Sequence, residues 1–152
     1  MKLSAAMRAL VERERLGFVA SVNDDGTPNV SPKGTFVVLD DERLAFLDVR
    51  SPMTSANLAA RPAVEVNFVD PILRKGLRCR GRARVLASGT AECEQIVQAQ
   101  PLLARPAERY RALVIIEVKS TAPLISPAYD DGASEDEVSA GWKARWRARL
   151  AS

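Results

Sequence analysis

Apolar and polar residues alternate along much of this chain, a pattern that predicts short strands. The alternation is clearest over residues 63–69, where Val64, Val66 and Phe68 are separated by single residues, as in a strand with one buried face. The N-terminal region differs, because its apolar residues recur at helical spacing: Leu3, Met7, Leu10 and Val11. We therefore expect a β-rich domain with a few peripheral helices.

Turn residues divide this pattern into separate elements. Asn23-Asp24-Asp25-Gly26 predicts a hairpin turn in which Gly26 takes a positive φ, and Arg61-Pro62 ends a helix. We expect strands at 18–22, 28–33, 35–39, 43–48, 63–69, 77–86 and 111–119, and helices at 4–15, 52 to about 60, 89–99 and after 134. Six or seven strands with short hairpin links favour a mainly β, α+β fold, an antiparallel barrel.

The C-terminal part of the chain reads as an arm followed by a helix. Residues 120–133 contain Pro123, Pro127 and Gly132 and predict a surface arm. Ser134-Glu135-Asp136-Glu137 is a capping box for a helix whose apolar residues recur every fourth position: Val138, Trp142, Trp146 and Leu150. The two tryptophans share a helical face, so we expect them to anchor this helix by packing. No repeat or linker appears, and residues 1–152 are expected to form a single domain.

The composition of the chain excludes several kinds of chemistry but does not identify an activity. The chain has 152 residues, of which 47% are hydrophobic and 27% charged, and it has no apolar run long enough to cross a membrane. The N-terminus lacks the apolar core of a signal peptide, so we expect a cytoplasmic protein. The absence of histidine removes Ser-His and Cys-His catalysis and the commonest transition-metal ligand, and we expect no metal. Cys79 and Cys93 match no metal spacing and are expected to be buried thiols.

Arginines are concentrated in one predicted strand. Arg78, Arg80, Arg82 and Arg84 have the same parity and should line one face of it. No aromatic residue lies between them to stack on bases, so we expect no nucleic-acid partner. A solvated strand face and a site for a small anionic ligand both explain the row.

The start of the second predicted helix has the features of an anion site. Ser51 is a good N-cap, Pro52 sits at the first helical position, and Arg50 precedes them. A helix N-terminus offers unpaired N–H groups and a partial positive charge, which suit a phosphate. Helix capping alone also explains these residues.

The order of these motifs resembles the pyridoxamine 5′-phosphate oxidase-like flavoproteins, the FMN-binding split barrels. The resemblance covers roughly residues 14 to 87, and the tail with its Trp-bearing helix looks like a branch of short members. The matching pieces are Gly26-Thr27-Pro28, Ser31-Pro32-Lys33-Gly34, Phe46 to Leu58, Arg61-Pro62-Ala63-Val64 and Arg78-Cys79-Arg80-Gly81. The resemblance implies a split β-barrel and a homodimer with each flavin held between two subunits.

The family pattern also implies which residues contact the cofactor. Its first FMN-contacting strand falls on Ser31, Pro32, Lys33 and Gly34. The strand before the phosphate helix contributes Asp48 and Val49, and the helix start contributes Arg50, Ser51, Thr54 and Asn57. Arg78 of the partner subunit is a further candidate. Lys33 would stabilise a reduced flavin or add positive charge for the phosphate; the alternative is an exposed strand lysine.

Departures from the family pattern argue against pyridoxamine phosphate as the substrate. Ser31 stands where an arginine is expected, Met53-Thr54 stand in place of an Arg-Lys pair, and the C-terminal arginine motif is missing. The resemblance then implies an FMN-dependent oxidoreductase of unknown substrate, with NAD(P)H or a small molecule as partner. A non-catalytic flavin carrier or sensor and a deazaflavin-dependent reductase remain open alternatives.

Overall fold

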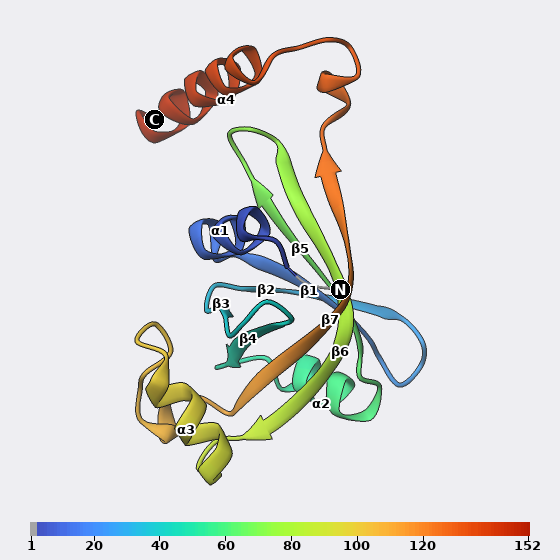
Figure 1. Cartoon of the computed structure of the whole chain (residues 1–152), viewed down its shortest axis with the longest axis vertical. Coiled ribbons are helices and arrows are strands. Elements are labelled where there is room, and N and C mark those ends of the chain that lie inside the picture. Colours follow the sequence, from blue (N-terminus) through green and yellow to red (C-terminus); the bar gives the residue numbers. More distant parts are fainter. Residues whose placement is uncertain (1–2) are drawn as a thin grey trace.

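Two long neighbouring strands organise the structure, a computed structural model that describes residues 3–152. Strands β6 (Lys75–Ala87) and β7 (Ala112–Ile125) pair along almost their whole length, and the rest of the sheet curls around them (Figure 1). The sheet is seven-stranded and antiparallel in the order β2-β1-β5-β6-β7-β4-β3. The other strands are β1 (Gly17–Val22), β2 (Pro28–Lys33), β3 (Val37–Val38), β4 (Arg43–Asp48) and β5 (Ala63–Asp70). The predicted split barrel of the α+β class is confirmed.

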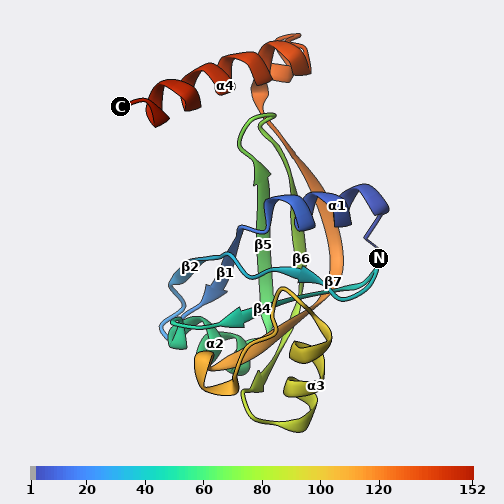
Figure 2. The same cartoon turned by 90° about the vertical axis from the view of Figure 1, so that its left-hand side faces the viewer.

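Residues 3–152 contain four α-helices: α1 (Ala5–Glu14), α2 (Pro52–Ala60), α3 (Ala91–Ala99) and α4 (Glu135–Leu150). Helix α1 lies across the strands, and α4 stands apart from the barrel at one end of the molecule (Figures 1 and 2). Helices α2 and α3 lie toward the opposite end. The aromatic core packs Phe36 against Phe46 and Phe68, with ring centroids 5.1 and 4.8 Å apart. A second core cluster lies under α3 and contains the buried Cys93 and Val97.

One edge strand of the sheet accounts for two prolines, and the other corrects a predicted boundary. Strand β2 pairs only with β1 among the described strands, which explains why it tolerates Pro28 and Pro32. The predicted strand at 35–39 was too long, because only Val37 and Val38 pair with β4. The Thr35 side chain takes the place of a ladder partner, accepting a hydrogen bond from the backbone N–H of Leu47 at 3.0 Å.

The predicted surface arm at 120–133 starts too early. Strand β7 continues to Ile125, where it pairs with Lys75, because β6 also begins earlier than its apolar pattern indicates. A register shift lies beside Gly81, whose Cβ would meet the carbonyl oxygen of Glu117 at 2.2 Å. Pairing between the two strands carries β7 past Pro123, one of the residues on which the prediction of an arm depended.

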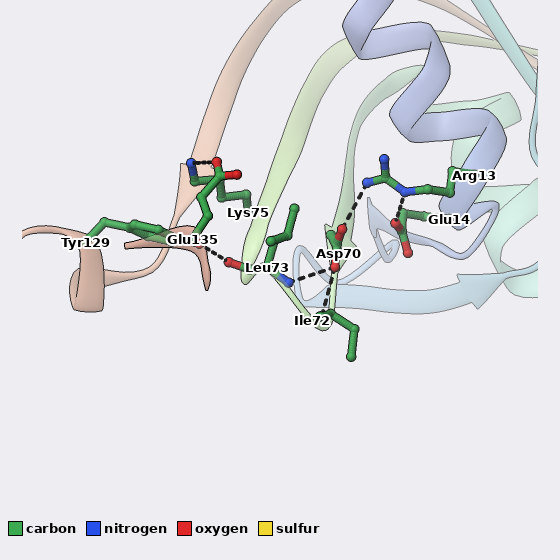
Figure 3. Close-up of polar contacts among 8 residues, drawn as sticks. All are labelled: Arg13, Glu14, Asp70, Ile72, Leu73, Lys75, Tyr129 and Glu135. Carbon is green, nitrogen blue, oxygen red and sulfur yellow. Dashed lines mark hydrogen bonds and ion pairs between the residues drawn. The ribbon is translucent and has the colours of Figure 1, made fainter. Parts of the chain in front are cut away.

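The tip of the β5–β6 hairpin anchors the C-terminal helix (Figure 3). Lys75 donates a hydrogen bond of 2.5 Å to Glu135, and the Tyr129 hydroxyl donates one of 2.6 Å to the carbonyl of Leu73. The guanidinium of Arg74 stacks on Trp142 at 3.3 Å from the ring centroid. Trp142 is therefore an anchor, as expected, and it holds α4 on the hairpin rather than on the barrel.

Candidate functional site

A buried lysine lies at the start of α2. Lys33 ends β2, is only 6% exposed, and donates hydrogen bonds to the hydroxyl of Ser51 at 2.6 Å and to the hydroxyl of Ser31. Strand alternation places Ser31 and Lys33 on the same face of β2, and this face turns toward α2. Burial lowers the pKa of Lys33, and the negative charge of Asp48 opposes that shift. The alternative of an exposed strand lysine is therefore wrong.

Asp48 holds the start of α2 from the other side. Its carboxylate is fully buried at the end of β4 and accepts hydrogen bonds from the backbone N–H of Ser51 at 2.6 Å and from the hydroxyl of Ser55 at 2.5 Å. The Ser51 side chain makes no capping hydrogen bond. The expectation that Ser51 caps α2 through its hydroxyl is therefore wrong, because that hydroxyl accepts from Lys33 instead.

Thr54 and Asn57 face the β1–β2 hairpin. Both side chains are buried. Thr54 accepts a hydrogen bond of 3.2 Å from Asn29, and Asn57 donates to Asn23 at 2.8 Å and to Ser21 at 3.2 Å. Their polar atoms are thus used to fasten α2 to the hairpin.

The remaining predicted contacts lie on the surface around this cluster. Pro32, Gly34, Val49 and Arg50 are exposed. Arg78 pairs with Glu65 at 3.0 Å, and Arg80 pairs with the same carboxylate at 2.6 Å. The structure therefore brings together Ser31, Lys33, Asp48 and Ser51, whereas the charge of Arg78 is matched by a carboxylate on the neighbouring strand.

The arginine row keeps the single face that its parity predicted, but it is not a bare cationic strip. Arg84 pairs with Glu92 at 2.6 Å, in addition to the two arginines that share Glu65. Lys119 chiefly lowers the pKa of Glu117, and the charge of Arg82 adds a smaller contribution in the same direction. This pattern fits a solvated strand face.

Comparison of the sequence with models of known protein families gives one match. A family model for pyridoxamine 5′-phosphate oxidase matches residues 3–122. The chain belongs to this family. The match ends within β7, so α4 and its connection lie outside the family model. The comparison with curated proteins finds no match.

Solved structures of similar fold carry several different names. HupZ of Group A Streptococcus is 25% identical, with a TM-score of 0.66 over 82% of this chain and 95% of that one. A structure titled F420 reductase is 22% identical, with a TM-score of 0.61 over 79% and 98%. An FMN-binding protein of Syntrophomonas wolfei is 11% identical, with a TM-score of 0.60 over 77% and 82%. The last two show the fold alone.

Two residues of the site are missing from the predicted set of cofactor contacts. Ser55 lies one helical turn after Ser51, a spacing that places both at the same end of α2, and it binds Asp48. Asn29 lies two residues before Ser31 on the same face of β2 and donates a hydrogen bond to Thr54. An open groove of about 380 Å³ lies beside the start of α2, and its lining includes Asp48, Ser55, Val85 and Arg111.

The part of the chain that the structure describes contains neither a metal-binding cluster nor a membrane-spanning helix. No group of three or more cysteine, aspartate or glutamate side chains among residues 3–152 could hold a metal ion. None of the helices within that range is long and apolar enough to cross a membrane.

Proposed function

We propose that this member of the pyridoxamine 5′-phosphate oxidase family binds a flavin-type cofactor, FMN, and uses it as an oxidoreductase. The observation that carries the proposal is the buried ammonium of Lys33 beside the first turn of α2. A buried cation costs free energy unless an anion compensates it, and a helix N-terminus is itself suited to an anion. Within residues 3–152, Lys33 forms no salt bridge with a carboxylate. Asp48 acts on Lys33 without forming an ion pair with it, so a ligand phosphate would supply a negative charge in direct contact with the ammonium.

The residues present fit such a group. Lys33 and the hydroxyl of Ser51 would hold the phosphate, together with the backbone N–H groups of Met53 and Thr54 in the first turn of α2. Bound flavin supplies hydride and electron transfer itself, so the protein need only orient the ring and tune its surroundings. This division of labour suits a chain without histidine.

A second copy of the chain would complete the site, as in other homodimeric split barrels. The outer face of β1 and β2 supports this, because it exposes Val30 at 61%, Phe18 at 42% and Val22 at 40%. Adjacent exposed apolar side chains on a sheet are typical of an interface. The substrate is then a small molecule that reaches the flavin between the two subunits, with NAD(P)H as the electron donor.

Reconstitution tests the proposal directly. The purified protein is mixed with excess FMN, desalted and examined for the visible absorption band of oxidised flavin. We expect the band in the wild type, and a weaker one in Lys33→Met than in the matched control Lys119→Met on the far strand. A wild-type protein that stays colourless would refute flavin binding.

Turnover separates an enzyme from a carrier. Bleaching of the flavin band by NADH or NADPH, followed by recovery with an added electron acceptor, supports the oxidoreductase. A band that neither nucleotide bleaches favours a carrier or sensor. Mass analysis of ligand released from protein purified without added flavin distinguishes FMN from a deazaflavin.

A further inference from the structure

Arg74, at the tip of the β5–β6 hairpin, carries a positive charge that no carboxylate within residues 3–152 pairs with. Its side chain is half-buried, and its guanidinium stacks on Trp142, with the central carbon 3.3 Å from the ring centroid. The Nε atom is buried and has no hydrogen-bond partner in the described part of the chain. Stacking uses the face of a guanidinium, whereas its hydrogen bonds are made in its plane. Arg74 is thus a partly desolvated cation whose charge is uncompensated.

The carboxylates that contact the hairpin are used by other groups (Figure 3). Asp70 pairs with Arg13 at 3.0 Å and also accepts two backbone N–H groups of the hairpin turn. Glu135 pairs with Lys75 at 2.5 Å. Neither carboxylate forms an ion pair with Arg74.

A second arginine adds positive charge beside the same indole. The Arg145 guanidinium lies 5.5 Å from the ring centroid of Trp142, and it too has no salt bridge among the described residues. A desolvated cation is stabilised by an anion, and a planar carboxylate can accept two parallel N–H bonds from a guanidinium. The charges around Trp142 therefore favour an anionic ligand.

An apolar groove of about 340 Å³ opens beside these cations. Its lining combines four apolar residues with two polar ones: Val69, Leu124, Ile125, Trp142, Arg74 and Ser126. Ile125 is 56% exposed and Val69 is 36% exposed, so a ligand here would cover apolar surface that now faces water. The volume is at the low end for ligand pockets, which suits a small molecule.

The backbone holds Arg74 in place beside the groove. Its N–H donates to the carbonyl of Asp70 at 2.8 Å, and its own carbonyl accepts from the N–H of Ser126 at 3.0 Å. These bonds fix the residue in the left-handed region, at a φ of 54°. A guanidinium fixed by its backbone and by stacking loses little conformational freedom when it binds.

We propose that the groove between the β5–β6 hairpin and α4 binds a small aromatic carboxylate. The carboxylate accepts hydrogen bonds from the terminal N–H groups of Arg74, and the ring lies against Leu124 and Ile125. The groove belongs to the end of the molecule that carries α4, opposite the end that carries α2 (Figure 1). The proposal therefore stands apart from the proposed flavin site, and a failure of flavin binding would leave it intact.

Three probes separate the charge from the ring on the wild-type protein. Benzoate has both, benzamide has the same ring without the charge, and acetate has the charge without the ring. We expect benzoate to bind at least about tenfold more tightly than benzamide, because it adds a charge-assisted pair, and than acetate, because it buries a ring. Isothermal titration calorimetry without flavin measures the three affinities. Equal affinity for benzoate and either other probe, or no binding of benzoate, overturns the proposal.

Tryptophan fluorescence locates the bound probe. The chain has two tryptophans, so Trp146→Phe leaves Trp142 as the reporter. Benzoate should change its emission and saturate at the dissociation constant that calorimetry gives. Binding of benzoate without any change in Trp142 emission would place the ligand elsewhere and overturn the proposal.

Two pairs of variants test the residues of the groove. Arg74→Gln should weaken benzoate at least about tenfold, whereas Arg80→Gln removes the charge of an arginine already paired with Glu65 at 2.6 Å and should leave it unchanged. Ile125→Glu places a carboxylate in the groove without altering the Arg74 stack and should abolish binding. Leu150→Glu adds the same charge at a residue that is 83% exposed and should have no effect. Wild-type affinity for benzoate in either Arg74→Gln or Ile125→Glu overturns the proposal.

Discussion

The ammonium of Lys33 donates a hydrogen bond of 2.6 Å to the hydroxyl of Ser51. This bond joins the end of β2 to the residue before α2, and it brings a buried positive charge to the start of a helix. Asp48, at the end of β4, accepts a hydrogen bond from the backbone N–H of the same serine. One serine thus links a cation, an anion and a helix N-terminus.

Arg50 is expected to recognise the phosphate of the ligand rather than the flavin ring. Arg50→Ala should weaken FMN binding by about fivefold, the effect of an exposed charge pair worth about 1 kcal/mol. Riboflavin binding should be unaffected, and so should FMN binding by Arg43→Ala, which removes an arginine from the β3–β4 turn. Fluorescence titration checks this, and equal weakening of both flavins would refute a phosphate contact.

Asn57 should matter for stability more than Met53, an exposed residue of the same helix. Asn57→Ala removes the hydrogen bonds to Asn23 and Ser21 and leaves buried polar atoms without partners, at a cost of about 2 kcal/mol in the free energy of unfolding. Met53 is 59% exposed, so Met53→Ala should change it by no more than about 0.5 kcal/mol. Urea unfolding measures both, and equal effects would contradict the fastening role of Asn57.

Gly81 permits the close approach of β6 and β7. A Cβ at this position would lie 2.2 Å from the carbonyl oxygen of Glu117, so Gly81→Ala must displace backbone and should cost roughly 1–3 kcal/mol of stability. Gly141 on α4 has open space within 4 Å of where a Cβ would lie, and Gly141→Ala should stabilise by up to about 1 kcal/mol. Opposite signs in thermal unfolding are the expected result; a neutral Gly81→Ala would show that β7 shifts freely.

Trp142 should decide whether α4 stays on the hairpin. Trp142→Ala removes the stacking partner of Arg74 and should expose the α4 backbone to trypsin, which cleaves after Lys143 and the arginines beyond it. Leu150 is 83% exposed, so Leu150→Ala should leave the cleavage rate unchanged. Gel analysis of limited digests measures the rates. Equal rates in Trp142→Ala and the wild type would place the anchor elsewhere.

The Cys79 thiol should be inert in the folded protein. Burial raises its pKa from 9.0 to about 12, so a thiol reagent at about pH 8 should label Cys79 only after unfolding. Because the folded state holds this proton more tightly, the stability that it contributes is complete below pH 9.0 and is lost as the pH rises toward about 12. The difference in unfolding free energy between wild type and Cys79→Ala should therefore shrink over that range. A constant difference would contradict the shifted pKa.

Much of the fold was predictable from local pattern, and the reasons are visible in particular residues. The Asn-Asp-Asp-Gly turn forms with Gly26 at a φ of 83°, and the Ser134 capping box starts α4. Both features depend on residues within a few positions of each other. The end of β7 was missed because it depends on β6, a partner far away in the chain.

The sequence by itself determined the strand and helix order, the family, and several of the residues near the start of α2, including Lys33, Asp48 and Ser51. Tertiary structure alone decided what those residues do there. Local sequence predicts that Ser51 caps α2, but in the structure its hydroxyl accepts a hydrogen bond from Lys33 of β2. Local sequence also allows Lys33 to be an exposed strand residue, but it is buried beside the start of α2. Local periodicity specifies which face a side chain takes, but its partner, burial and charge environment depend on contacts between elements that are distant in the chain.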